Sequence, residues 1–165
     1  MRLVTRADLD GLACAALITA MEEIESLVFV EPKFMQDGAV EVREGDIIAN
    51  LPYHPNCRLW FDHHITNAPS WSRHLGISRN AERQTRDLSI VPGKGGFGLA
   101  PSAARVVYEY YSTVSSQDPR YSMEKAEGLR ILNSERMQAF LEKTDRIDAG
   151  RLTPDEVLQP AGFVL

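Results

Sequence analysis

The sequence has few cysteines and no long apolar run. Its 165 residues include two cysteines, Cys14 and Cys57, which excludes a disulfide framework or a cysteine-rich zinc module. No apolar run reaches the roughly 18–20 residues of a membrane span. Charged residues interrupt the N-terminus from Arg2 onward, so it has no signal-peptide core. We therefore expect a cytoplasmic protein that does not contact a membrane.

The chain also lacks an excess of positive charge. It has 18 Lys and Arg residues against 23 Asp and Glu, a formal net charge of −5 with His neutral. Such a chain is a poor candidate for holding duplex DNA by charge alone, whereas a few local cations suffice for a smaller phosphate ligand. Hydrophobic residues make up 44% of the chain, the composition of a globular domain that needs no disulfide or structural metal to fold.

The order of apolar patterns predicts an α/β fold. We expect four short strands, at residues 2–5, 26–30, 46–49 and 57–61, and a weaker edge element between Gly38 and Gly45. Three helical patterns are present: one that begins near Leu12, one opened by Pro101 and Ser102, and one over residues 122–147 with a break near Asn133 and Ser134. Strands that alternate with helices indicate a Rossmann-like, mostly parallel sheet flanked by helices.

The apolar residues in the middle of the chain show no sustained helical or strand periodicity. We interpret residues 65–100 as a long Arg- and Gly-rich loop within a single domain that spans residues 1–165, with a small strand within residues 87–93. The glycine-rich residues 93–98 lack the G-x-x-x-x-G-K-[ST] pattern of a P-loop and are interpreted as a flexible turn. His74 is interpreted as a surface histidine.

The last residues form an apolar, strand-like run, Phe163-Val164-Leu165. A strand without a partner exposes unpaired backbone groups and tends to pair with another chain. We therefore expect that the chain is truncated at its C-terminus, and that this form is either a homodimer or catalytically impaired.

The sharpest local feature is Asp62-His63-His64, directly after a predicted buried strand. A carboxylate and two imidazoles at the carboxyl end of a strand lie where α/β sheets gather their ligands. An isolated triplet of this kind is more often a solvated turn than a site. A second motif makes a functional site the better interpretation of the triplet.

This second motif is Asp8-Leu9-Asp10-Gly11, after the first predicted strand. One of its two carboxylates is enough to cap the following helix. The second carboxylate is then available to bind a metal ion, and the N-terminus of the helix also favours a bound anion such as phosphate. The two motifs together predict a site at one edge of the sheet.

With Asp148-Ala149-Gly150-Arg151-Leu152, these motifs resemble the DHH phosphoesterase superfamily. In that family a D-x-D-G motif follows the first strand, the DHH triplet follows a later strand, and a further Asp lies in a D-[TSA]-G-x-[FL] context. The match spans residues 2 to about 152, and the chain looks most like the exopolyphosphatase-related branch.

The chain departs from the family pattern at three places. Asn50 occupies the position of an Asp that commonly bridges two metals. Val4 and Arg6 occupy the places where many members have a His or Asp. The chain also ends before the second, smaller substrate-binding domain that family members usually have.

The resemblance implies a metal-dependent hydrolase of phosphoanhydride or phosphodiester bonds. The implied metal ligands are Asp8, Asp10, Asp62, His63 and Asp148, and the implied catalytic residues are Asp62, His63 and His64. Further candidates are Asn50, His54 and Asp145 for contact with the metal or its ligands, and Lys94, Ser102 and Arg105 for phosphate binding. We expect two Mn²⁺ ions, with Mg²⁺ as the alternative, or one ion if the uncharged Asn50 cannot bridge a pair.

An alternative remains open at this point. The chain is then a non-catalytic metal- or nucleotide-binding regulatory module on a degraded DHH scaffold, which Asn50 and the absent second domain favour. The intact triplet, the D-x-D motif and Asp148 favour the enzyme. Its substrate, a phosphate-containing small molecule or a short oligonucleotide, is open among pyrophosphate, polyphosphate, oligonucleotides and cyclic dinucleotides.

Overall fold

The computed structural model describes residues 1–76 and 87–160. Within them, six strands form one sheet in the order β2-β1-β3-β4-β6-β5. The strands are β1 (Arg2–Arg6), β2 (Ser26–Val30), β3 (Ile47–Ala49), β4 (Leu59–Asp62), β5 (Ser89–Val91) and β6 (Gly95–Phe97). All neighbours pair in parallel except β5 and β6, which are antiparallel. The predicted α/β fold with a mostly parallel sheet is therefore confirmed.

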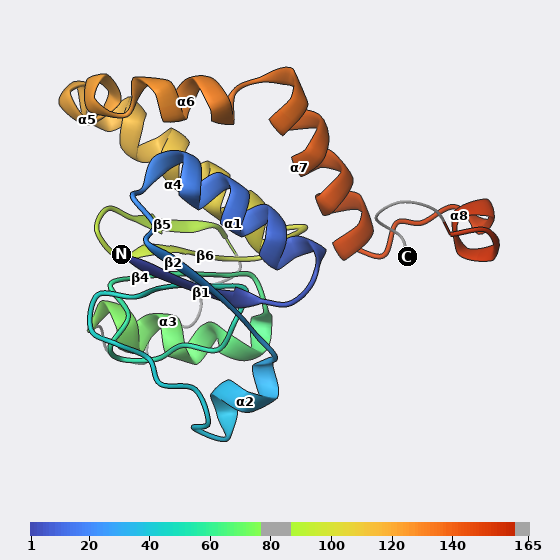
Figure 1. Cartoon of the computed structure of the whole chain (residues 1–165), viewed down its shortest axis with the longest axis horizontal. Coiled ribbons are helices and arrows are strands. Elements are labelled where there is room, and N and C mark those ends of the chain that lie inside the picture. Colours follow the sequence, from blue (N-terminus) through green and yellow to red (C-terminus); the bar gives the residue numbers. More distant parts are fainter. Residues whose placement is uncertain (77–86, 161–165) are drawn as a thin grey trace.

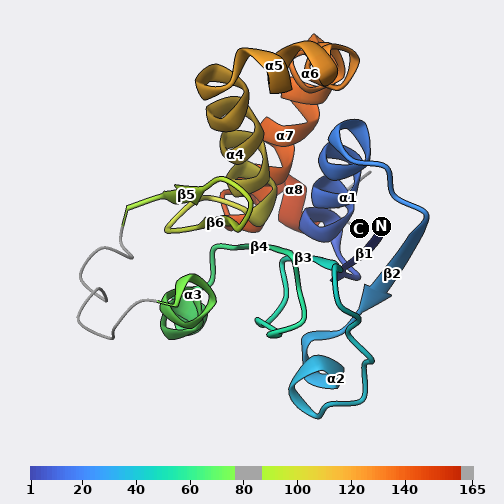
Figure 2. The ribbon, with the colours of Figure 1, turned by 90° about the vertical axis from the view of Figure 1, so that its left-hand side faces the viewer.

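Helices cover both faces of the sheet (Figures 1 and 2). On one face α1 (Leu9–Met21) and α4 (Ala103–Gln117) pack on the sheet, with α6 (Ala126–Leu132) and α7 (Glu135–Asp148) against these helices, and α2 (Pro32–Gln36) and α3 (Ala68–Leu75) lie on the other face. The remaining helical segments are η1 (Ile65–Asn67), α5 (Pro119–Glu124) and α8 (Pro154–Leu158). No helix in the described ranges is long and apolar enough to cross a membrane.

The strands are buried on both faces because each contributes alternate side chains to two cores. Leu3, Ile47 and Leu59 pack with the apolar side of α1 and α4. Their neighbours in sequence, Val4, Ile48 and Trp60, pack in the second core with Trp71 and Phe97. This is the pattern of a parallel sheet covered by helices on both sides.

The predicted break near Asn133 and Ser134 agrees with the structure, whereas the break between α5 and α6 was not predicted. The stretch predicted for residues 122–147 is divided between α5, α6 and α7, and Ser134 caps α7 at the predicted break by accepting a hydrogen bond from the N–H of Met137. The edge element expected between Gly38 and Gly45 is absent, since those described residues form turns and irregular backbone after α2.

The long loop predicted for residues 65–100 is wrong in its described part. That part contains η1, α3, β5 and β6, of which only the small strand β5 was predicted. The glycine-rich turn is also a correction, because Gly95–Phe97 forms β6 beside β4. A Cβ atom at Gly95 would lie 2.1 Å from the carbonyl oxygen of Trp60, so glycine is required for the two backbones to meet.

His74 also differs from its prediction as a surface residue, since its ring is buried at the end of α3. There it packs near Trp71 and Tyr53, and its Nε2 lies 2.8 Å from the carbonyl oxygen of Lys94. The expected pairing of the apolar C-terminal run falls on residues 161–165, which lie outside the described residues.

Candidate functional site

The two sequence motifs meet at the carboxyl edge of the parallel strands. Thr5 of β1 is in register with Ala49 of β3, and Ala49 is in register with Phe61 of β4. The residues that follow these strands therefore come to one edge of the sheet. They are the D-x-D motif after β1, Asn50 after β3 and the triplet after β4.

Asp10 joins α1 to the N-terminus of α4. Its two carboxylate oxygens accept hydrogen bonds from the backbone N–H groups of Ala103, at 2.9 Å, and Ala104, at 2.8 Å. The side chain is almost fully buried. Burial raises the pKa of Asp10 to about 7, the charge of Asp148 adds to the rise, and the two backbone donors oppose it. Asp10 is therefore a rigidly held carboxylate in a site of crowded negative charge.

Gly11 allows the D-x-D motif to turn sharply into α1. A Cβ atom at this position would lie 2.0 Å from the carbonyl oxygen of Arg6, so the backbone has no room for a larger residue. The N–H of Gly11 donates a 2.8 Å hydrogen bond to Asp8, which caps the helix. The glycine in the motif thus sets where both carboxylates lie.

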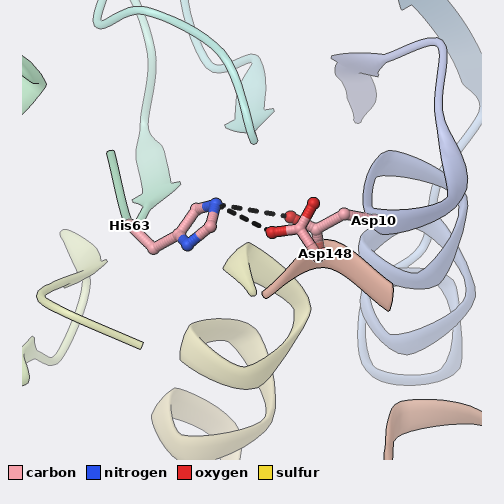
Figure 3. Close-up of side chains that lie close together, drawn as sticks. All are labelled: Asp10, His63 and Asp148. Carbon is pink, nitrogen blue, oxygen red and sulfur yellow. Dashed lines mark ion pairs between the residues drawn. The ribbon is translucent and has the colours of Figure 1, made fainter. Parts of the chain in front are cut away.

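His63 points toward two carboxylates from different helices (Figure 3). Its Nε2 lies 3.3 Å from Oδ2 of Asp148 and 3.8 Å from Oδ2 of Asp10. Its Nδ1 lies 3.1 Å from the carbonyl oxygen of Ala100, an acceptor that assigns the proton to Nδ1. In the neutral form of the ring, the lone pair of Nε2 then points at the carboxylates, and this buried atom has no hydrogen-bond partner among the described residues.

A divalent cation fits this donor set. One ligand atom from each of Asp10, His63 and Asp148 lies within 4.8 Å of the others. The pKa of Asp148 is raised by burial and by the charge of Asp8, while the positive charge of a protonated His63 opposes that rise. Two carboxylates with raised pKa values and an imidazole lone pair repel one another, and a cation between them removes that repulsion. Oxygen and imidazole ligands suit Mn²⁺ and, with more oxygen ligands, Mg²⁺.

Asp62 holds the triplet in place rather than joining these three residues. Its Oδ1 accepts hydrogen bonds from Nδ1 of His64, at 2.7 Å, and from the N–H of His63, at 2.9 Å. Its Oδ2 accepts from Nδ2 of Asn67, at 2.6 Å. The hydrogen bond to Asp62 raises the pKa of His64, whose ring is partly exposed beside the site.

Asp8 faces the protein's own polar groups. Its Oδ1 accepts a 3.1 Å hydrogen bond from Nδ2 of Asn50, and its Oδ2 lies 2.9 Å from Nε of Arg6. Asn50 adopts a positive φ of 55° and is buried, and its Oδ1 has no partner among the described residues. Where the resemblance leads us to expect a bridging Asp, the chain therefore has an amide that donates to Asp8.

The remaining candidates lie elsewhere or serve the fold. Asp145 accepts hydrogen bonds from Oγ of Ser102, at 2.6 Å, and from Nε of Arg105, at 2.9 Å, and these contacts fasten α7 to the start of α4. His54 accepts from the N–H of Asn56 in the loop before β4. Lys94 precedes β6, whose first residue pairs with Trp60, so it lies at the amino edge, opposite the site.

Three contributors were not predicted. The carbonyl oxygen of Ala100 and the backbone N–H groups at the start of α4 orient His63 and Asp10, but backbone groups leave no signal in a sequence. Asn67 reaches Asp62 only because η1 turns the chain back after the triplet. The sole available signal was the polar residue five positions after Asp62.

No protein-family model and no curated protein matches the chain. A solved structure does: the pGpG-specific phosphodiesterase PggH from Vibrio cholerae, with 36% sequence identity and a TM-score of 0.59. The match covers 99% of this chain and 42% of that protein, so the chain spans less than half of its length. The chain is thus similar over nearly its whole length to part of a phosphodiesterase, which supports the resemblance to the DHH phosphoesterase superfamily but not to its exopolyphosphatase-related branch.

Proposed function

We propose that the chain is a metal-dependent phosphodiesterase that hydrolyses short linear oligonucleotides, with a dinucleotide such as pGpG as substrate. The observation that carries this proposal is the meeting of Asp10, His63 and Asp148 around the unpaired Nε2 of His63. The 36% identity to a pGpG-specific phosphodiesterase supports the choice of a phosphodiester over pyrophosphate or polyphosphate.

In this proposal Asp10, His63 and Asp148 hold one divalent cation, Mn²⁺ or Mg²⁺. A bound cation of this kind supplies a hydroxide at neutral pH and takes up negative charge on the phosphoryl oxygens. The backbone N–H groups of Ala103 and Ala104 hold Asp10, and the carbonyl oxygen of Ala100 holds His63. Both ligands are thus fixed before any cation arrives, which limits the cost of ordering them.

His64 and Asp62 act beside the cation in the same proposal. Asp62 accepts the Nδ1 proton of His64 and fixes the ring, and it raises the pKa of His64, which favours the protonated ring whose Nε2–H can donate a hydrogen bond. We assign His64 to a phosphate oxygen of the substrate or to the leaving oxygen, because its ring is partly exposed next to the three ligands. Asp62 is a positioning residue that holds the backbone of His63 and the ring of His64 in place.

Cleavage of pGpG tests the proposal. The chain is incubated with pGpG and Mn²⁺ or EDTA, and the mononucleotide product is measured by chromatography, with pyrophosphate in a parallel assay. We expect Mn²⁺-dependent cleavage of pGpG that falls by about 100-fold or more in His63→Ala. Arg43→Ala is the matched control, because the side chain of Arg43 is exposed and pairs with Glu41, away from the site. Absence of pGpG cleavage in Mn²⁺ would contradict the proposal.

A non-catalytic binding module is the second candidate, and one observation favours it. Asp8 already forms an ion pair with Arg6 and accepts a hydrogen bond from Asn50, an arrangement that leaves it less available to hold a second cation. The same assay separates the two functions, since a module binds Mn²⁺ and the nucleotide without releasing a product.

A further inference from the structure

A pocket lies on the side of α2, and His64, the neighbour of the cation ligand His63, is part of its lining. Its volume is about 210 Å³, and its lining includes Arg6, Gln36, Asn50, Asn67, Pro32 and Pro52. Pockets for whole drug-sized ligands measure roughly 300–1,000 Å³, so this one is suited to a single fragment of a dinucleotide. Arg6 and Asn50 contact Asp8, and Asn67 contacts Asp62, so the pocket shares its walls with both motifs.

We propose that this pocket is the subsite for one guanine base of the substrate. The assignment rests on the proposed function, because a base here places the adjoining phosphodiester beside His64 and the cation ligands. His64 itself lines the pocket, and its ring lies 4.4 Å from the ring of His63, centroid to centroid. The ring of His64 therefore connects the pocket to the cation ligand His63.

Arg6 supplies the contact that selects guanine. Its Nε lies 2.9 Å from Asp8, while its two terminal nitrogens have no hydrogen bond to any other residue in the described ranges. A guanidinium fork matches the neighbouring acceptors O6 and N7 of guanine. Adenine offers N7 beside an N6 donor, so one of the two contacts becomes a clash of donors.

The other walls fit a base better than a phosphate. Pro32 and Pro52 give the pocket apolar surface against which a flat ring packs. Asn67 donates its amide to Asp62, which leaves its Oδ1 to accept from the N1–H and N2–H groups of guanine. Asp8 already offsets the charge of Arg6, and a dianionic phosphate would lie near that carboxylate. The pocket therefore favours a neutral ligand with acceptors on one side and donors on the other.

Binding of GMP and AMP in EDTA tests this subsite, because the two nucleotides share the same ribose and phosphate. Calorimetry on the full chain should show GMP binding roughly 10-fold or more tightly than AMP. Arg6→Lys keeps the charge but removes the fork, and the GMP-to-AMP affinity ratio should fall toward one. The matched control, Arg43→Lys, changes an exposed arginine outside the pocket and should keep the wild-type ratio.

Equal affinity for GMP and AMP in the wild-type chain would overturn the subsite, and so would an unchanged ratio in Arg6→Lys. If Arg6→Lys fails to fold, the side-chain amide NMR signals of Gln36 and Asn67 in the wild-type chain decide the matter: they should shift with GMP, and unshifted signals would contradict the proposal. No cleavage occurs in this experiment. Failure of guanine selection therefore leaves the hydrolase proposal intact, and absence of pGpG cleavage leaves guanine selection intact.

Discussion

Nε2 of His63 lies 3.3 Å from Oδ2 of Asp148, so the last turn of α7 lies next to the triplet that follows β4 (Figure 3). The contact brings together residues from distant parts of the sequence, and Asp10 of α1 completes the group. α1 and α7 each pack against α4, and Asp10 is itself bonded to the first turn of α4. Packing among these helices and the geometry of the site are therefore linked.

Replacement of Asp10 tests that link. Asp10→Ala leaves the buried N–H groups of Ala103 and Ala104 without acceptors, which should lower the free energy of unfolding by about 1–3 kcal/mol. Urea denaturation at pH 7.5 measures the change. Asp37→Ala is the control, because Asp37 is exposed and pairs with Lys33 on the same helix end. Equal stability of the two variants would show that the Asp10 contacts do not support α4.

Two neighbouring glycines test the close approach of β6 to β4. Gly95→Ala places a Cβ atom 2.1 Å from the carbonyl oxygen of Trp60 and should cost about 3 kcal/mol of unfolding free energy or prevent folding. Gly93→Ala also has a positive φ, of 75°, but nothing lies within 4 Å of its Cβ, so it should cost about 1 kcal/mol. Thermal or urea unfolding compares them. Similar losses in both variants would contradict the steric argument.

His74 predicts a pH dependence of stability. Burial lowers its pKa below the ordinary value of 6.5, so the unfolded chain takes up a proton in a pH range where the folded chain does not. The buried, neutral His74 therefore contributes to the free energy of unfolding above pH 6.5, and this contribution is lost as the pH falls below that value. Between pH 7.5 and 5.5 the wild-type chain should lose more unfolding free energy than His74→Gln. Arg43→Ala, which leaves every histidine in place, should keep the wild-type slope, and identical slopes in all three proteins would contradict the prediction.

The sequence predicts much of the sheet and the convergence of its motifs, because both depend on local pattern. Alternating strands and helices indicate parallel pairing, and parallel pairing brings the ends of β1 and β4 to one edge. Asp10 and His63 therefore meet as expected. Gly95 shows where this reasoning stops, since three residues of strand with two glycines have the composition of a turn, and only pairing with β4 makes them a strand.

The helical pattern alone does not distinguish Asp145 from Asp148, and only the resemblance of residues 148–152 to a family motif singled out Asp148 as a ligand. They lie one turn apart on α7, and the sequence contains both as acidic residues near a helix end. The packing of α7 directs Asp148 toward His63 and Asp145 toward Arg105. Asp8 differs from Asp10 for a similar reason, because Arg6 and Asn50 come to it from β1 and from the end of β3.

Calorimetric titration with Mn²⁺ tests the central claim that Asp10, His63 and Asp148 form a cation site. We expect the wild-type chain to bind one ion with an affinity in the micromolar range. Asp148→Asn should weaken binding by about 10-fold or more, whereas Asp145→Asn, which changes the contact with Arg105 instead, should keep the wild-type affinity. Absence of micromolar binding by the wild-type chain, or equal weakening in the two variants, would contradict the account.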